Sequence, residues 1–176
     1  MVVLGKPYKA QHVADSMSSY LLVVGCSDRK NTSPFPMKAL DRYEGVNFKV
    51  IKKFNREKGF PDNMDIAIVS ARYGLITSDE YIDLYDIRMT RKRAAVLHPE
   101  IMDDLKDLIS GKTYKEVFVV LGKEYMRAIE GIELIAPCPV VYARGRIGEK
   151  MAALKKWLNR VFLAKEGQQK LTDLKL

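Results

Sequence analysis

Residues 65–89, DIAIVSARYGLITSDEYIDLYDIRM, decide both the fold and the site that we expect. The run Ile66–Val69 predicts a buried strand, because it is too short for a helix and rich in β-branched residues. A hydroxyl, a guanidinium, a phenol and a glycine follow directly in Ser70-Ala71-Arg72-Tyr73-Gly74. In an open α/β sheet, ligands bind at the carboxyl ends of the strands. The stretch therefore indicates a site; the alternative is a strand, a turn and a surface helix with ordinary charges.

Three other apolar runs predict strands of the same sheet: Tyr20–Val24, Val117–Leu121 and Val140–Tyr142. Segments with helical periodicity separate them, and this alternation is typical of helices that cover both faces of a parallel sheet. The first run is apolar at every position, as a central strand with two buried faces should be. We therefore expect a three-layer α/β sandwich with a mainly parallel sheet of about four strands.

The sequence predicts a single domain over residues 20–164. Residues 1–19 show no clear periodicity and are expected to form an arm, with a short strand at Val2–Leu4. The polar residues 165–176 are expected to form a frayed tail. A chain of 176 residues is long enough to bury a core, and it contains no internal repeat.

The expected helices follow from the spacing of apolar residues and from helix-breaking residues. Met37, Leu40 and Tyr43 share one face of a short helix after a proline-rich turn. A second helix is expected over 46–58, with Val46, Val50, Ile51 and Phe54 facing inward. A third should end near Leu97, and a new one should begin at Pro99. Two more are expected over 123–130 and after Gly148.

The composition is that of a soluble globular protein, with 47% hydrophobic and 30% charged residues. Two cysteines, Cys26 and Cys138, cannot form a disulfide framework, which favours a reducing, cytoplasmic setting. With two histidines and no clustered His/Cys spacing, the sequence predicts no metal site, and it indicates no cofactor. No apolar run fits a signal peptide or the roughly 20 residues of a membrane span, so we expect no membrane partner.

The net charge favours an anionic partner. Thirty Lys and Arg against 22 Asp and Glu give a formal charge of +8, which suits a nucleic acid or a nucleotide. Arg88, Arg91, Lys92 and Arg93 place four cations within six residues, just after the central stretch, and are the predicted phosphate contacts. The alternative is a basic surface that binds nothing.

Polar residues follow each predicted strand, and parallel strands bring their carboxyl ends to one edge of the sheet. We therefore expect one cleft there, lined by Ser27, Ser70, Arg72, Tyr73, Asp86, Lys123 and Tyr125. The predicted substrate-binding residues are Ser27, Lys30, Arg72, Tyr73, Tyr85, Lys123 and Tyr125. Tyr73 and Tyr85 could stack on a base or simply pack at the rim.

The candidate catalytic residues are Cys26, Ser70 and Asp86. The thiol of Cys26 lies close in sequence to two cations that would favour a thiolate, but no histidine partner is evident, and a small buried turn residue is the alternative. Asp86 and Asp79, both in the central stretch, are the candidate general bases for chemistry at an N-glycosidic bond. The alternative for Asp86 is a helix or turn cap.

The ordered set of strand-end motifs resembles a small, largely uncharacterised bacterial, archaeal and phage family. The motifs are Gly25-Cys26-Ser27-x-x-Lys30, Ser70-Ala71-Arg72-Tyr73-Gly74-Leu75 with a downstream Tyr85-Asp86, Gly122-Lys123-x-Tyr125, and Gly145-x-Ile147-Gly148. That family carries a Cys-Ser-x-x-Lys turn, a Ser-Ala-Lys-Tyr-Gly-Leu motif and a Tyr-Asp pair. The resemblance covers about residues 20–160. The family is distantly similar to the peroxide-stress YaaA group and to the core domain of archaeosine synthase, whose fold resembles uracil-DNA glycosylases.

The resemblance implies a domain that handles nucleotides or nucleobases, with N-glycosidic or related transfer chemistry on a modified base in nucleic acid. Arg72 replaces the lysine of the family motif, which preserves anion binding but removes a lysine nucleophile. The water-activating aspartate loop and the His-Ser-Pro loop of true uracil glycosylases are both absent, which argues against uracil excision. The alternative function is a non-catalytic nucleic-acid-binding protein.

Overall fold

A computed structural model describes residues 19–173 of the chain. The predicted arm, except for Ser19, and its short strand at Val2–Leu4 lie outside the described residues. Ser19 begins the first strand of the sheet.

A five-stranded sheet forms the centre of the molecule. In spatial order its strands are β4 (Gly74–Thr77), β3 (Met64–Ser70), β1 (Ser19–Gly25), β6 (Tyr114–Val120) and β7 (Val140–Tyr142). Neighbouring strands from β3 to β7 are parallel, while β4 pairs antiparallel with β3. The four predicted strands are thus present, and the prediction missed β4, which folds back from β3 through the three-residue turn 71–73 and begins at Gly74, whose φ is 73°.

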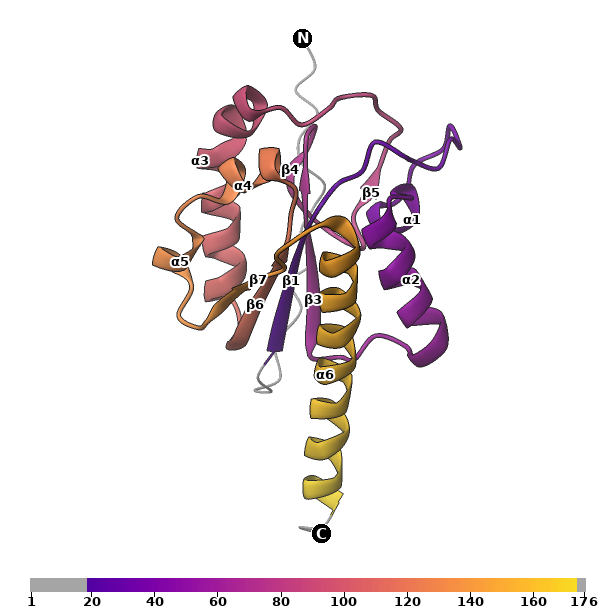
Figure 1. The fold of residues 1–176 in the computed structure, drawn as a ribbon, viewed down its shortest axis with the longest axis vertical. Coiled ribbons are helices and arrows are strands. Elements are labelled where there is room, and N and C mark those ends of the chain that lie inside the picture. Colours follow the sequence, from indigo (N-terminus) through magenta and orange to yellow (C-terminus); the bar gives the residue numbers. More distant parts are fainter. Residues whose placement is uncertain (1–18, 174–176) are drawn as a thin grey trace.

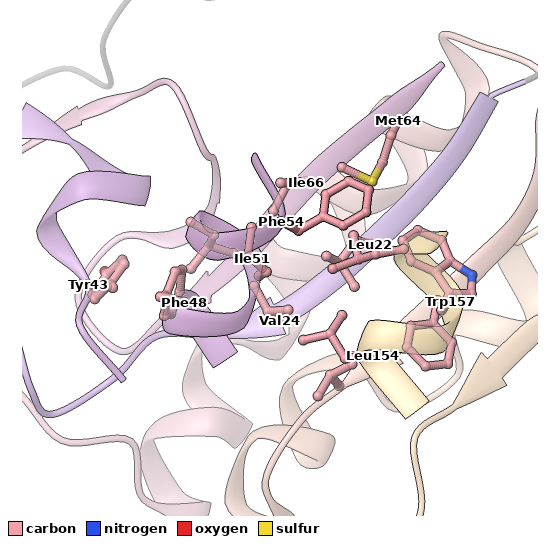
Figure 2. Close-up of a cluster of buried hydrophobic side chains, with 14 of the residues drawn as sticks. Leu22, Val24, Tyr43, Phe48, Ile51, Phe54, Met64, Ile66, Leu154 and Trp157 are labelled. Carbon is pink, nitrogen blue, oxygen red and sulfur yellow. The ribbon is translucent and has the colours of Figure 1, made fainter. Parts of the chain in front are cut away.

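Helices cover both faces of the sheet, so the fold is a three-layer α/β sandwich (Figure 1). Helices α2 (Val46–Lys58) and α6 (Ile147–Asp173) cover one face, and α3 (Arg91–Ser110) covers the other. Figure 2 shows the first core, where Leu22 and Val24 of β1 lie among side chains from α2 and α6. Leu21 and Val23 alternate with them and face the second core. Both faces of β1 are therefore buried, as its uninterrupted apolar sequence predicted.

Several short elements lie outside the sheet and the three long helices. Strands β2 (Met37–Lys38) and β5 (Tyr81–Ile82) form an antiparallel ribbon beside α1 (Ala39–Arg42). After β6 come α4 (Lys123–Met126), the 3-10 turn η1 (Arg127–Ile129) and α5 (Ile132–Ile135). The helix expected over 123–130 is thus a single α-turn followed by a 3-10 turn.

Several helix predictions need correction. The bounds of α2 are as predicted, but Val46 is 45% exposed and Phe48 takes the inward position. Met37 lies in β2 and not on a helix. Residues 165–173, expected as a frayed tail, continue α6, where Lys165 bonds to Asp62 at 2.9 Å.

Helix α3 runs through Pro99, where the sequence predicted one helix to end and another to begin. A proline inside a helix removes one backbone hydrogen bond and costs about 3 kcal/mol. Leu97, Ile101 and Leu105 are buried against the sheet on either side of the proline. Their burial, roughly 1.5–3 kcal/mol for each side chain, outweighs that cost.

The connections create a crevice at one edge of the sheet. The chain passes from β1 to β3 over the face that α2 covers, and from β3 to β6 over the face that α3 covers. The strand order therefore reverses between β1 and β6, and such a switch point is where open α/β sheets bind ligands. Val24 pairs in register with both Ile68 and Val120, so the carboxyl ends of β1, β3 and β6 lie level.

Candidate functional site at the carboxyl edge of the sheet

A pocket of about 460 Å³ opens at the switch point between β1 and β6. It is lined by Cys26, Asp28, Arg88, Met89, Gly122, Lys123, Glu124 and Tyr125. Three segments distant in the sequence supply these residues: the turn after β1, the loop before α3 and the start of α4. Its position is the one that the parallel topology predicts for a ligand site.

Cys26 and Tyr125 are held together in this pocket. The Cys26 sulfur lies 3.2 Å from the Tyr125 hydroxyl, and the Ala71 backbone N–H donates to the same sulfur at 3.4 Å. Tyr125 donates its proton to the Cys26 carbonyl at 3.1 Å, so the thiol is the group that donates to the phenol oxygen. Burial, with Cys26 beside it, raises the pKa of Tyr125 well above its usual range, which keeps this phenol protonated. The tyrosine ring packs directly over Gly25, where a Cβ would lie only 3.1 Å away.

Two cations and two carboxylates stand around the pocket. Arg88 and Asp28 form an exposed ion pair at 3.1 Å. Lys123 and Glu124 are exposed, and neither side chain has an ion pair or hydrogen bond with another residue of the described chain. The pocket can therefore offer a free ammonium group to an anion and carboxylate oxygens to N–H donors.

A closed ring of three buried hydroxyl groups lies at the end of β3. Ser70 and Tyr43 are completely buried, and Tyr85 is nearly so. The Tyr43 and Tyr85 oxygens are 2.7 Å apart, Ser70 lies 3.0 Å from Tyr85, and Tyr43 donates to Ser70 at 3.3 Å. Ser70 also accepts the backbone N–H groups of Arg72 and Tyr73 at 3.3 and 3.1 Å. The ring thereby fixes the turn between β3 and β4.

The direction of the hydrogen bonds around this ring follows from which hydroxyl groups donate. Ser70 accepts from Tyr43, so its single proton goes to Tyr85, and Tyr85 in turn donates to Tyr43. Burial, and the nearby Cys26, raise the pKa of both tyrosines far above the usual range, so neither ionises near neutral pH. The Lys30 ammonium sits 4.4 Å from the centre of the Tyr85 ring, a cation–π contact that ties the turn after β1 to the same cluster.

The predicted site residues do not all line the pocket. Cys26, Lys123, Tyr125 and Arg88 do. Ser70 is completely buried at the end of β3 and does not reach the pocket surface. Ser27 stabilises the turn after β1, because its hydroxyl donates to the Arg29 carbonyl at 2.6 Å and accepts the Gly45 N–H at 3.0 Å.

Other predicted residues lie at the same edge but outside the pocket lining. Tyr73 packs edge-on against Tyr85 and accepts the backbone N–H of Asp83 at 3.2 Å. The Arg72 guanidinium lies over the Tyr73 ring at 5.3 Å and is exposed. Asp86 is exposed and has no hydrogen bond or ion pair with any other residue within 19–173. Asp79, the second candidate base, pairs with Lys38 at 3.0 Å beside the β2–β5 ribbon.

The predicted phosphate contacts of the first turn of α3 differ in their hydrogen bonds. Arg91 and Lys92 are exposed in the first turn of α3. Arg93 is different: its Nε donates to the Ala71 carbonyl at 2.8 Å, and its Nη2 lies 3.5 Å from the Arg72 carbonyl. Arg93 thus contacts the β3–β4 turn through two backbone carbonyls, and its role as a phosphate contact stays a prediction.

Sequence reasoning missed several residues that build the site. Asp28 and Glu124 each sit beside a predicted residue, yet a carboxylate within a basic motif gives no sign that it faces a pocket. Tyr43 was assigned to an apolar helix face, which hid the role of its hydroxyl. Arg42 is completely buried and donates to the carbonyls of Asn31, Ser33, Phe35 and Ile82, so it anchors the loop that leads to β2. Only contacts between distant segments reveal these roles.

Residues 19–173 contain neither a metal-binding cluster nor a membrane-spanning helix. No group of three or more His, Cys, Asp or Glu side chains is arranged as a metal site would require. None of the helices in this part of the chain combines the length and apolar character that crossing a bilayer demands.

Comparisons with known proteins give a fold and a family. The crystal structure of AF0587, a protein of unknown function, is similar to this chain with a TM-score of 0.51 and 14% sequence identity, over 80% of this chain and 44% of that one. The chain thus spans less than half the length of that protein, and at this identity the likeness concerns the fold alone. No curated protein matches the sequence. A family match extends over residues 21–156, from β1 into α6, and includes every residue of the pocket, so the chain belongs to DUF6884, a family of unknown function.

Proposed function

We propose that this protein binds a nucleotide, either free or within a nucleic acid, in the pocket between β1 and β6. The observation that carries the proposal is the pocket itself: it lies at the topological switch point and has Lys123 and Arg88 at its rim. Lys123 has no acidic partner among the described residues, so an anionic ligand can take that place. The formal charge of +8 also attracts a phosphate-bearing ligand to the surface.

The same pocket offers groups for a nucleobase. Asp28 and Glu124 supply carboxylate oxygens, which accept N–H donors such as the exocyclic amino groups of bases. Met89 and the Tyr125 ring add apolar surface on which a base can rest. A ligand that carries both a phosphate and a base therefore satisfies this mixture of cations, carboxylates and apolar surface better than a simple anion does.

The fold is compatible with a ligand that contains a nucleobase. The three-layer sandwich with its parallel sheet agrees with the resemblance to the uracil-DNA glycosylase fold, and we include that fold relationship in the proposal. Fold alone does not establish a reaction, because one fold serves many activities. The chemistry has to be argued from the side chains.

A catalytic form of the proposal gives Asp86 the role of general base. Its carboxylate would take a proton from water as the water oxygen bonds to the sugar C1′ and the C1′–N bond breaks. The base leaves with the electron pair of that bond as an anion, and it then takes up the proton that Asp86 removed from the water. The observation that favours Asp86 is that it is exposed, has no partner among the described residues and precedes Arg88 of the pocket by two positions. Ser70 has no exposed surface, so it acts by holding the turn and not on a substrate.

The second candidate is a non-catalytic nucleic-acid-binding protein. The exposed side chains of Arg91, Lys92 and Arg72 at the same edge favour it, because phosphate contacts need accessible cations. Both candidates place a nucleotide in the same pocket and differ only in turnover.

Binding is tested by titrating a mononucleotide into the wild type, Lys123→Ala and Lys115→Ala. Lys115 is the matched control, because its side chain is also exposed but lies near the start of β6, whereas Lys123 follows the end of that strand. We expect Lys123→Ala to lose about tenfold in affinity and Lys115→Ala to keep wild-type affinity. Equal affinities for all three proteins would contradict the proposed site.

Catalysis is tested by following the release of free base from nucleotides and oligonucleotides. Asp86→Asn should abolish release while leaving affinity nearly unchanged, and Asp83→Asn, an exposed carboxylate three residues earlier, should behave as wild type. If the wild type releases no base from any substrate that it binds, the non-catalytic candidate stands.

A further inference from the structure

We infer that a single strand of nucleic acid crosses the carboxyl edge of the sheet, with its phosphates held by Arg91 and Lys92 on one flank of the pocket and by Arg144 and Arg146 on the other. This inference rests on the proposed nucleotide site and extends it. It adds Arg144 and Arg146 to the predicted phosphate contacts, and it selects a polymer over a free nucleotide as the ligand.

The two flanks follow from the layers of the fold. Helices α3 and α6 lie on opposite faces of the sheet, and both begin at its carboxyl edge (Figure 1). Arg91 and Lys92 are in the first turn of α3, directly after Met89 of the pocket lining. Arg144 and Arg146 are in the turn between β7 and α6.

Hydrogen bonds attach this second turn to the pocket. The Ala143 backbone N–H donates to the Val119 carbonyl at 2.8 Å, next to the end of β6. Lys150, in the first turn of α6, donates to the Leu121 carbonyl at 2.8 Å. Leu121 directly precedes Gly122, which lines the pocket. The turn that carries Arg144 and Arg146 is therefore fixed beside the pocket, on the side away from α3.

The side chains on both flanks are exposed and available. Arg91, Lys92, Arg144 and Arg146 have no ion pair or side-chain hydrogen bond with another residue in the described part of the chain. Glu149 is the acidic residue nearest in sequence on the α6 flank, and its carboxylate accepts the Arg146 backbone N–H at 2.6 Å, so it caps the helix.

The charges at the start of α3 oppose the helix dipole. A helix N-terminus carries partial positive charge and is stabilised by acids, yet the first turn of α3 contains Arg91 and Lys92 and no acid. Cations in this position destabilise the helix, and bound phosphates would relieve the repulsion. The start of α6 differs, because Glu149 lies in its first turn and caps it, so Arg144 and Arg146 contribute as exposed cations just before the helix.

A single strand fits this arrangement better than a duplex. The pocket takes one nucleotide between the two flanks, and a base inside a duplex would first have to leave its stack and its pair. A single strand presents an unpaired base at no such cost, while positive side chains follow its backbone. Because phosphates are engaged on both sides of the pocket, affinity should rise from a mononucleotide to an oligonucleotide of three or more residues.

The test compares Arg144→Ala/Arg146→Ala with the control Lys155→Ala/Lys156→Ala. Both double variants remove two exposed cations, and the control pair lies further along α6, away from its first turn. Each protein is titrated with a mononucleotide, a single-stranded hexanucleotide and the corresponding duplex at several salt concentrations. Unfolding followed by the fluorescence of Trp157, the single tryptophan, verifies that both variants keep the wild-type stability.

For Arg144→Ala/Arg146→Ala we expect hexanucleotide affinity to fall about tenfold and the log–log salt slope to become shallower by about 1.4, or roughly 0.7 for each lost contact. Mononucleotide affinity should stay within about twofold of wild type, and the control should change neither ligand by more than about twofold. These results together would support the proposed path of the nucleic-acid strand across the carboxyl edge of the sheet.

Several outcomes would overturn it. Wild-type hexanucleotide affinity in Arg144→Ala/Arg146→Ala, or an equal loss in the control variant, would show that no local contact exists. A duplex that binds more tightly than the single strand would refute the choice of polymer. If neither the mononucleotide nor the hexanucleotide binds the wild type, the proposed nucleotide site itself fails; if the mononucleotide alone binds, that site stands and only the strand path is lost.

Discussion

The hydroxyl oxygens of Tyr43 and Tyr85 lie 2.7 Å apart, although 42 residues separate them in the chain. This contact closes the hydroxyl ring through Ser70 and joins three segments: the residue after α1, the end of β3 and the loop that carries Arg88 to the pocket. The ring contains only neutral groups, and each hydroxyl both donates and accepts. It therefore holds the edge of the site without placing a charge in the interior.

Removing one hydroxyl from the ring should destabilise the protein. Tyr85→Phe keeps the ring packing but leaves the proton of Ser70 without its acceptor and Tyr43 without its donor. A buried polar group that loses its partner costs about 1–3 kcal/mol, so we expect the free energy of unfolding to fall by that amount. Urea unfolding followed by Trp157 fluorescence measures it.

Tyr81→Phe is the control for that measurement. Tyr81 is 62% exposed, and its hydroxyl has no hydrogen bond within residues 19–173. Its replacement should change the free energy of unfolding by less than about 0.5 kcal/mol. If Tyr85→Phe were no more costly than Tyr81→Phe, the ring would not be a stabilising network.

Alkaline pH should destabilise the fold. Burial raises the pKa of Tyr43, Tyr85, Tyr114 and Tyr125 far above the ordinary value of about 10. Above pH 10 the unfolded chain loses phenol protons that the folded chain retains, so the free energy of unfolding falls as the pH rises. Each such tyrosine contributes up to about 1.4 kcal/mol per pH unit.

The Tyr85→Phe variant also tests this pH dependence. It lacks one of the titrating groups, so its loss of stability between pH 9 and pH 11 should be less steep than that of the wild type, by up to about one proton. Urea midpoints at a series of pH values give both slopes. Equal slopes for the two proteins would exclude Tyr85 as a contributor.

The start of α2 depends on a close approach between Gly45 and Ser27. A Cβ on residue 45 would lie 2.5 Å from the Ser27 Cβ, which no side chain tolerates without movement. Gly45→Ala should therefore reduce the free energy of unfolding by about 1–3 kcal/mol and disturb the turn after β1. Gly148→Ala, in the first turn of α6 with no atom within 4 Å, should instead be neutral or stabilising by up to about 1 kcal/mol. Chemical denaturation of the two variants compares them directly.

Neighbouring cations of α3 should have opposite phenotypes. Arg93→Ala removes the hydrogen bond to the Ala71 carbonyl, and we expect a loss of about 1–2 kcal/mol in the free energy of unfolding. Arg91→Ala/Lys92→Ala should leave stability unchanged or slightly increased, because it removes cations from a helix N-terminus. The same double variant should make the salt slope for a single-stranded oligonucleotide shallower by about 1.4. The opposite roles would be indicated if Arg91→Ala/Lys92→Ala lost stability, or if Arg93→Ala alone made the salt dependence of oligonucleotide binding shallower.

The sequence by itself determined the layers of this protein. Continuous apolar runs specified β1, β3 and β6, because a strand with both faces buried needs apolar side chains at every position. The edge strand β7 followed from its apolar, β-branched sequence, although its residues are only partly buried. Glycines at positions 45 and 59 bounded α2 at the residues predicted. The gathering of polar residues at one edge also followed from sequence, since parallel strands with helical crossovers bring their carboxyl ends together.

Only the tertiary structure decided which side chains meet at that edge. Cys26 and Tyr125 are 99 residues apart, and nothing local distinguishes them from Ser27 or Ser70, which turn away from the pocket or lie beneath it. Helix α3 passes through Pro99 because its buried face packs on the sheet, and the half-buried Arg93 donates to a carbonyl of the β3–β4 turn. Periodicity and propensity are local properties that fix elements, whereas a pocket and its hydrogen bonds arise from contacts between segments that only packing brings together.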